Sequence, residues 1–150
     1  MDRYIGIDVS KAMLDIATLP DGESWTVTND DQGLAELLPR LVALAPTLVV
    51  LEATGGFELL AALTLAKAGL PVAVVNPRQV RDLAWALGRL AKTDALDAGL
   101  LATFAERVRP EPRPLPDEAA LHLESLVARR RQSSTCSPPR RIGSASRAAP

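Results

Sequence analysis

Short segments of alternating apolar and polar residues fill the first part of the chain. Residues 4–9, 13–18 and 25–28 are rich in β-branched and aromatic side chains, which is typical of strands. A turn at residues 20–23 contains proline and glycine and separates the last two. Consecutive strands with short connections pair antiparallel. We therefore predict a three-stranded antiparallel meander.

A helix is predicted directly after the meander. Its apolar side chains recur at helical spacing: Leu34, Leu37, Leu38 and Leu41. The polar segment 29–31 offers an N-cap, because its side chains can accept hydrogen bonds from the first free amides. Pro39 lies inside the pattern and predicts a kink or a break, since proline has no amide to donate.

Two continuous apolar runs, residues 47–51 and 71–75, have the length of strands that are buried on both faces. Helical patterns over residues 57–68 and 78–92 follow them. Parallel strands need helical crossovers, so this part predicts a parallel arrangement. Together with the meander, the pattern predicts an α/β fold with a mixed five-stranded sheet and flanking helices.

The last part of the chain changes character twice. Residues 110–116 alternate with proline, which predicts a stiff, extended linker after a folded domain at 1–109. Residues 117–132 predict a helix that begins a coiled region. Residues 133–150 are rich in Ser, Pro and Arg without periodicity, which predicts a disordered tail.

Composition narrows the class of protein. With 47% hydrophobic and only 3% aromatic residues, a chain of 150 residues can build one core of Leu, Val and Ala. The single cysteine, Cys136, excludes an internal disulfide and argues against a cysteine-based zinc site. No signal peptide and no run of about 20 apolar residues is present, which predicts a cytoplasmic protein without a membrane partner.

The formal net charge of −1 hides an asymmetry. All 18 acidic residues lie at or before Glu124, where they outnumber 11 Lys and Arg, whereas the remaining residues carry only basic charge. A basic tail on an acidic body can indicate a nucleic-acid-binding arm. It can equally indicate that the tail has a different origin from the body.

Two carboxylates terminate predicted strands. Asp8 lies in the first strand and Glu52 follows the first buried parallel strand. Burying an unpaired carboxylate is costly, so each needs a cation, a partner or water, and a solvent-facing Asp8 is the simple alternative. The carboxyl ends of adjacent parallel strands meet at one edge of a sheet, where ligands bind.

A second acidic pair, Asp94 and Asp97, lies one helical turn apart in a predicted helix that begins near Thr93. The spacing puts both on the face that carries Leu101 and Phe104, which should pack onto the sheet. The alternative is that these acids simply suit the first turn of a helix, with Thr93 as its N-cap. Burying such a pair is expensive unless a metal ion neutralises it.

Oxygen ligands without histidine or cysteine indicate a hard cation such as Mg²⁺ or Mn²⁺. Two such ions can activate a nucleophile and stabilise the leaving oxygen of a phosphodiester. We therefore group four carboxylates as catalytic and metal-binding candidates: Asp8, Glu52, Asp94 and Asp97.

A basic stripe is predicted on the helix over residues 78–92. Five side chains fall within an arc of about 80°: Arg78, Arg81, Trp85, Arg89 and Lys92. The stripe can contact phosphates with a stacking aromatic, or it can be an ordinary solvated face. A helix break at Gly88 would take Arg89 and Lys92 out of the helical register of the stripe. Lys11, just after the first strand, joins the nucleic-acid-binding candidates.

Four motifs resemble one known family, the DEDD-type insertion-sequence transposases. The motifs are IGIDVSK at residues 5–11, LEATG at 51–55, VNP at 75–77 and AKTDALDA at 91–98, in the order and spacing of that family. The resemblance covers roughly residues 3–132. It implies a ribonuclease H-like domain of the Holliday-junction resolvase (RuvC-like) type. It also implies two divalent metals on the four carboxylates, DNA cleavage and strand exchange, a bridging RNA partner and a homo-oligomer.

The resemblance is expected to stop at Gln132. Members of the family continue into a coiled region and a second domain with a serine that attacks DNA, whereas residues 133–150 match neither and look like a shifted reading frame or a truncated copy. We therefore expect a domain that cannot complete transposition alone. Whether this domain is itself an enzyme stays open. The alternatives are a non-catalytic nucleic-acid-binding remnant that inhibits assembly of an intact relative, and a fragment of an actin-like or sugar-kinase ATPase.

Overall fold

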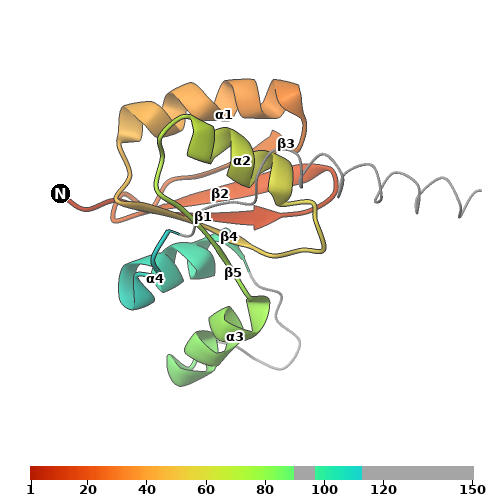
Figure 1. Ribbon diagram of the computed structural model, residues 1–150. Coiled ribbons are helices and arrows are strands. Elements are labelled where there is room, and N and C mark those ends of the chain that lie inside the picture. Colours follow the sequence, from red (N-terminus) through yellow and green to blue (C-terminus); the bar gives the residue numbers. More distant parts are fainter. Residues whose placement is uncertain (90–96, 113–150) are drawn as a thin grey trace, which may run out of the picture. The chain divides into compact units, whose positions relative to one another are not determined.

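The computed structural model describes residues 1–89 and 97–112 (Figure 1). All of them belong to the first of two compact units, residues 1–116. The elements follow the order β1 (Tyr4–Val9), β2 (Met13–Leu19), β3 (Ser24–Thr28), α1 (Asp31–Leu44), β4 (Leu48–Glu52), α2 (Leu59–Lys67), β5 (Val72–Val75), α3 (Pro77–Ala86) and α4 (Ala98–Val108).

One mixed sheet with the order β3-β2-β1-β4-β5 organises the described residues. The first three strands pair antiparallel, whereas β4 pairs parallel with both β1 and β5. The apolar runs of β4 and β5 are explained by burial on both faces, because helices cover each side of the sheet. The predicted five-stranded mixed sheet with flanking helices is confirmed.

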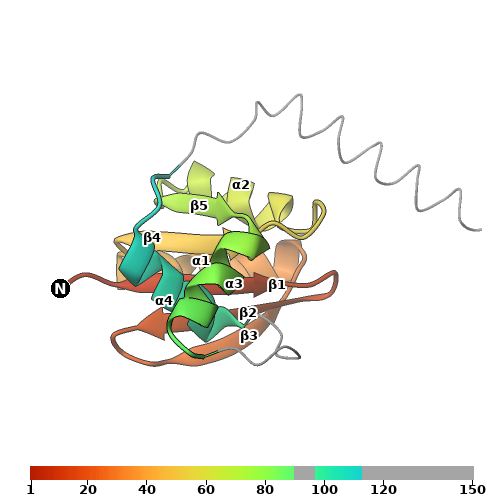
Figure 2. The same ribbon diagram turned by 90° about the horizontal axis from the view of Figure 1, so that it is seen from below.

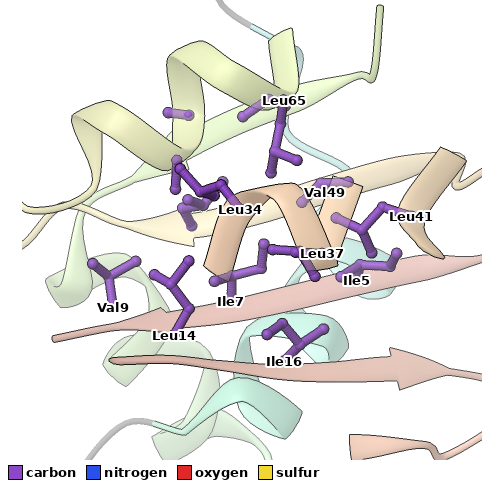
Figure 3. Close-up of a cluster of buried hydrophobic side chains, with 14 of the residues drawn as sticks. Ile5, Ile7, Val9, Leu14, Ile16, Leu34, Leu37, Leu41, Val49 and Leu65 are labelled. Carbon is purple, nitrogen blue, oxygen red and sulfur yellow. The ribbon is translucent and has the colours of Figure 1, made fainter. Parts of the chain in front are cut away.

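The first face of the sheet carries a continuous apolar layer beneath α1 and α2. Alternate residues of the strands point into it, and Figure 3 shows these side chains between the strands and the two helices. Most strand residues on this face are aliphatic, with Trp25 packed against the cluster and the hydroxyl-bearing Thr18 buried near its margin. Its completely buried members include Ile5, Ile7, Leu14, Leu37, Leu41, Leu51 and Leu65.

The opposite face carries α3 and α4, which lie in front of the sheet in Figure 2. Gly6 explains how closely α4 approaches β1. A Cβ on Gly6 would collide with the carbonyl oxygen of Ala98 and the amide nitrogen of Ala102. Glycine therefore allows backbone to pack on backbone at the point where α4 crosses the central strand. The N-terminus of α4 is brought to β1 in this way.

Two helix predictions on the first face need correction. Pro39 does not break its helix, because α1 runs without interruption from Asp31 to Leu44. Its N-cap is Asp30, whose carboxylate accepts a hydrogen bond from the amide of Gly33 at 2.8 Å. The helix predicted over residues 57–68 is shorter, at Leu59–Lys67.

The helix predicted over residues 78–92 was too long. In the structure α3 ends at Ala86, and Gly88 has a positive φ of 67°, a backbone conformation that ends a helix. The next helix, α4, begins only at Ala98. The predicted start near Thr93 lies outside the described residues, as do the predicted helix at 117–132 and the tail at 133–150. None of the helices in the described ranges has the length and apolar character needed to cross a bilayer.

Candidate active site

Asp8 and Glu52 lie side by side at the carboxyl edge of the parallel strands. The last paired residues of β1 and β4 are Ile7 and Leu51, so each carboxylate is the next residue of its strand. Strand alternation turns both away from the apolar layer and toward the face covered by α3 and α4. Both side chains are half-buried. The expected meeting of these two acids at one edge of the sheet is what the structure shows.

The surroundings of Asp8 disfavour its charged form. Burial raises the pKa of the Asp8 carboxyl, and the negative charges of Asp15 and Asp97 raise it further, against a smaller lowering by the amide of Val9. Asp15 is the residue directly opposite Asp8 in the antiparallel β1–β2 pair. Three carboxylates therefore share one electrostatic environment.

Asp97 reaches this environment differently from the prediction. It does not lie within the helix but is the N-cap of α4, where its Oδ1 accepts a hydrogen bond from the amide of Leu100 at 2.7 Å. It is also exposed rather than packed on the sheet. The expectation of a core-facing Asp94–Asp97 pair on one helix is therefore wrong for Asp97, and Asp94 lies outside the described residues.

Glu52 combines an acidic and a basic neighbour. Burial raises the pKa of its carboxyl, the charge of Asp8 raises it further, and the guanidinium of Arg81 opposes them. Arg81 comes from α3, which begins directly after β5, the strand paired with β4. The edge thus holds several carboxylates with one arginine beside them.

The loop after Glu52 is held by an acid that the sequence did not single out. Glu58 is only 7% exposed, and its Oε2 accepts hydrogen bonds from the Thr54 amide at 3.1 Å, the Thr54 hydroxyl at 3.2 Å and the Gly56 amide at 3.0 Å. No spacing signal marks Glu58 in the sequence. Asp15 was also missed, but it could have been found, because a turn centred between residues 11 and 12 puts it opposite Asp8.

The basic stripe is partly present. Arg78, Arg81 and Trp85 are exposed on α3, and Trp85 is 54% exposed although it is a large apolar side chain. Arg89 lies beyond the helix end, and its Nη1 donates a hydrogen bond to the hydroxyl of Thr103 on α4 at 3.2 Å. The predicted helical register therefore fails for Arg89. Lys92 lies outside the described residues.

Two further features surround the acids. Lys11 is exposed in the β1–β2 turn, at the same edge of the sheet as Asp8. A groove of about 620 Å³ lies between α4 and the outer strands, lined by Asp8, Asp15, Asp97, Thr26 and Gly99 among others. The groove leads from the acids across β2 and β3. An extended substrate could reach the carboxylates along this surface.

The donor set suits a hard cation in kind. Asp8, Glu52 and Asp97 offer only oxygen ligands. Burial and neighbouring acids raise the pKa of the Asp8 and Glu52 carboxyls, and a divalent ion beside them would favour their charged form. The two ion pairs between described residues, Arg3–Asp21 and Arg40–Glu23, involve none of them. However, within residues 1–89 and 97–112 no three acidic, histidine or cysteine side chains are grouped closely enough to hold a metal.

The fold is similar to the ribonuclease H-like fold of RuvC. RuvC from Thermus thermophilus, solved in complex with a Holliday junction substrate, superposes with a TM-score of 0.51 at 19% identity, covering 72% of this chain and 96% of that one. At this low identity the likeness concerns the fold alone.

The family follows from the sequence comparison. A model of the DEDD insertion-sequence transposases, described as a transposase, matches residues 5–137, so the chain belongs to that family. Pilin gene-inverting proteins of Moraxella lacunata and Moraxella bovis are each 33% identical over 114 residues, which is 71% of this chain and 35% of theirs. The chain thus spans about a third of the length of these curated relatives. The family match extends past Gln132, where the resemblance was expected to stop.

Proposed function

We propose that this chain is the metal-dependent domain of a transposase that cleaves and exchanges DNA strands. The observation that carries the proposal is that Asp8 lies within electrostatic reach of both Glu52 and Asp97, with Arg81 beside Glu52. The relatives named for inverting a pilin gene perform a DNA rearrangement, which supports DNA as the substrate. From the family resemblance we add a bridging RNA and a homo-oligomer as partners of the whole protein.

The proposed ligands are Asp8, Glu52 and Asp97, with Asp94 as the fourth, and the proposed cofactor is two Mg²⁺ or Mn²⁺ ions. When bound, such ions polarise a phosphodiester and lower the pKa of the attacking oxygen. The chain's own part is to hold the acids near one another at the sheet edge, where a bound cation would favour their ionised form. The hydrogen bond from Leu100 occupies Oδ1 of Asp97 and orients that carboxylate, so its second oxygen remains for a cation.

Arg81 is proposed to hold a DNA phosphate near the acids. Its charge already lies close enough to Glu52 to oppose the rise of that carboxyl's pKa. Arg78 and Trp85 lie on the same exposed face of α3 as Arg81. An arginine there can bind phosphate and an indole can stack on a base. Lys11 would approach the strand from the β1–β2 turn.

Thermal unfolding with and without Mn²⁺ tests the metal site. The wild-type chain should gain several degrees in Tm at saturating Mn²⁺, because a ligand that binds only the folded state stabilises it. The double variant Asp8→Asn/Asp97→Asn should show no gain, although asparagine can still cap α4. A charge-matched control, Asp31→Asn/Glu36→Gln on exposed positions of α1, should respond like the wild type. An unchanged response of the site variant would refute the metal site.

DNA binding as a function of salt tests the basic stripe. Arg81→Glu should weaken binding and reduce the salt slope by about one, as for a lost phosphate contact. Arg107→Glu is the matched control, since Arg107 is exposed at the end of α4. Fluorescence anisotropy with a DNA duplex measures both. Equal slopes for Arg81→Glu and the wild type would return the stripe to an ordinary solvated surface.

A further inference from the structure

The two strands that carry Asp8 and Glu52 end in separate loops, and one side chain joins these loops. Asn29 lies between β3 and α1. Its Nδ2 donates a hydrogen bond to the carbonyl of Ser10 at 2.9 Å and another to the carbonyl of Phe57 at 3.1 Å. Ser10 follows β1 in the β1–β2 turn, and Phe57 lies in the loop between β4 and α2.

Each partner of Asn29 is itself fixed. The β1–β2 turn is closed by the Ser10 amide, which donates to the carbonyl of Met13 at 2.9 Å, and the Asn29 amide donates to the carbonyl of Ala12 at 2.9 Å. On the other side, Glu58 accepts three hydrogen bonds from the loop that contains Phe57. Asn29 therefore links two ordered segments rather than two free ends.

We propose that Asn29 is a positioning residue that sets the separation of Asp8 and Glu52 by linking the segments that follow their strands. This rests on the proposed metal site, because its consequence is the affinity of that site for a cation. A carboxamide can do this because its two N–H groups donate at once, whereas aspartate of the same size can only accept. Asn29→Asp would keep the volume and lose both donors.

The chain provides a matched control at the opposite ends of the same strands. Thr47 directly precedes β4, and its Oγ1 accepts a hydrogen bond from the amide of Arg3, which directly precedes β1, at 3.2 Å. Thr47→Ala therefore removes a side-chain link between β1 and β4 far from the acids. A merely structural contribution would be shared by both links, whereas only the Asn29 link lies at the ends of the strands that carry the acids.

Two measurements on the full chain test the proposal. Mn²⁺ binding, followed by the loss of the free-ion EPR signal, should weaken by about tenfold or more in Asn29→Ala and Asn29→Asp, the usual cost of losing a residue that orients metal ligands. Thr47→Ala should bind as the wild type does. In the metal-free protein, amide hydrogen exchange at Ser10 and Ala53 should become faster in the Asn29 variants and remain unchanged in Thr47→Ala.

The outcomes separate this inference from the proposed function. If the Asn29 variants keep wild-type Mn²⁺ affinity, or if Thr47→Ala weakens it equally, Asn29 does not position the site. If the wild type binds no Mn²⁺, the proposed metal site is wrong. In that case the amide exchange rates still test the role of Asn29. Unchanged protection at Ser10 and Ala53 in the Asn29 variants would show that Asn29 does not hold the two segments together.

Discussion

The two faces of the sheet are built from the same strands but serve different ends. Under α1 and α2, the residues Ile7 and Leu51 are fully buried in an aliphatic layer. One position further along each strand, Asp8 and Glu52 face the other side and stay half-buried. The first face therefore supplies stability, whereas the second gives up apolar packing at its edge to keep acids together.

The largest expected loss of stability comes from Leu51, whereas a change at its neighbour Glu52 in β4 should affect metal binding instead. Leu51→Ala should cost about 2–5 kcal/mol of unfolding free energy, because it removes a fully buried side chain and leaves a cavity. Glu52→Gln should cost little without metal, since burial and Asp8 already disfavour the charge. Chemical denaturation and Mn²⁺ titration distinguish them: only Glu52→Gln should lose metal binding. Loss of stability in both alike would remove the contrast between the faces.

A smaller loss of stability is expected from adding a side chain at Gly6, where the backbone of α4 packs on the backbone of β1. Gly6→Ala should destabilise the domain by about 1–3 kcal/mol, because the methyl group would collide with α4 and displace it from β1. Gly33→Ala is the control on the first face, where a methyl group would collide with the carbonyl of Thr28. Both should lower Tm, but only Gly6→Ala should also weaken Mn²⁺ binding by moving Asp97. Equal Mn²⁺ affinity in the two variants would contradict this.

The smallest expected effect is the change in stability with pH that the ionisation of Asp8 causes. Because the folded state raises the pKa of this carboxyl, its ionisation costs stability as the pH rises from about 4 toward neutrality. Asp8→Asn should therefore be more stable than the wild type at pH 7 without metal, by less than about 1 kcal/mol, with the difference vanishing at low pH. Tm measured across this pH range is the check.

The stability contributed by Asp30 should change with pH in the direction opposite to that of Asp8, because the pKa of Asp30 is lowered rather than raised. Its hydrogen bonds from the Gly33 amide and the Thr28 hydroxyl lower the pKa of its carboxyl. Asp30→Ala should therefore be less stable than the wild type at neutral pH, and the two should converge as the pH falls through that lowered pKa. The same sign for both variants would show that the folded state does not disfavour the charge of Asp8.

The pattern of the sequence predicted the sheet well, because strand identity depends on local alternation and local apolar runs. It identified five strands, the change from antiparallel to parallel pairing, and the two strand-end acids Asp8 and Glu52. Helix boundaries were less predictable. The end of α3 depends on the left-handed backbone at Gly88, and the start of α4 depends on where Asp97 can cap a helix that Gly6 lets approach β1.

Residue identity alone thus determined which acids face the same side of the sheet, since alternation along a strand is a local property. The tertiary structure decided what surrounds them. Only the strand pairing puts Asp15 opposite Asp8, only the packing of α3 brings Arg81 to Glu52, and only folding lets Asn29 join the two loops. The Arg81 and Asn29 contacts join residues far apart in the chain, and no periodicity in the sequence encodes them.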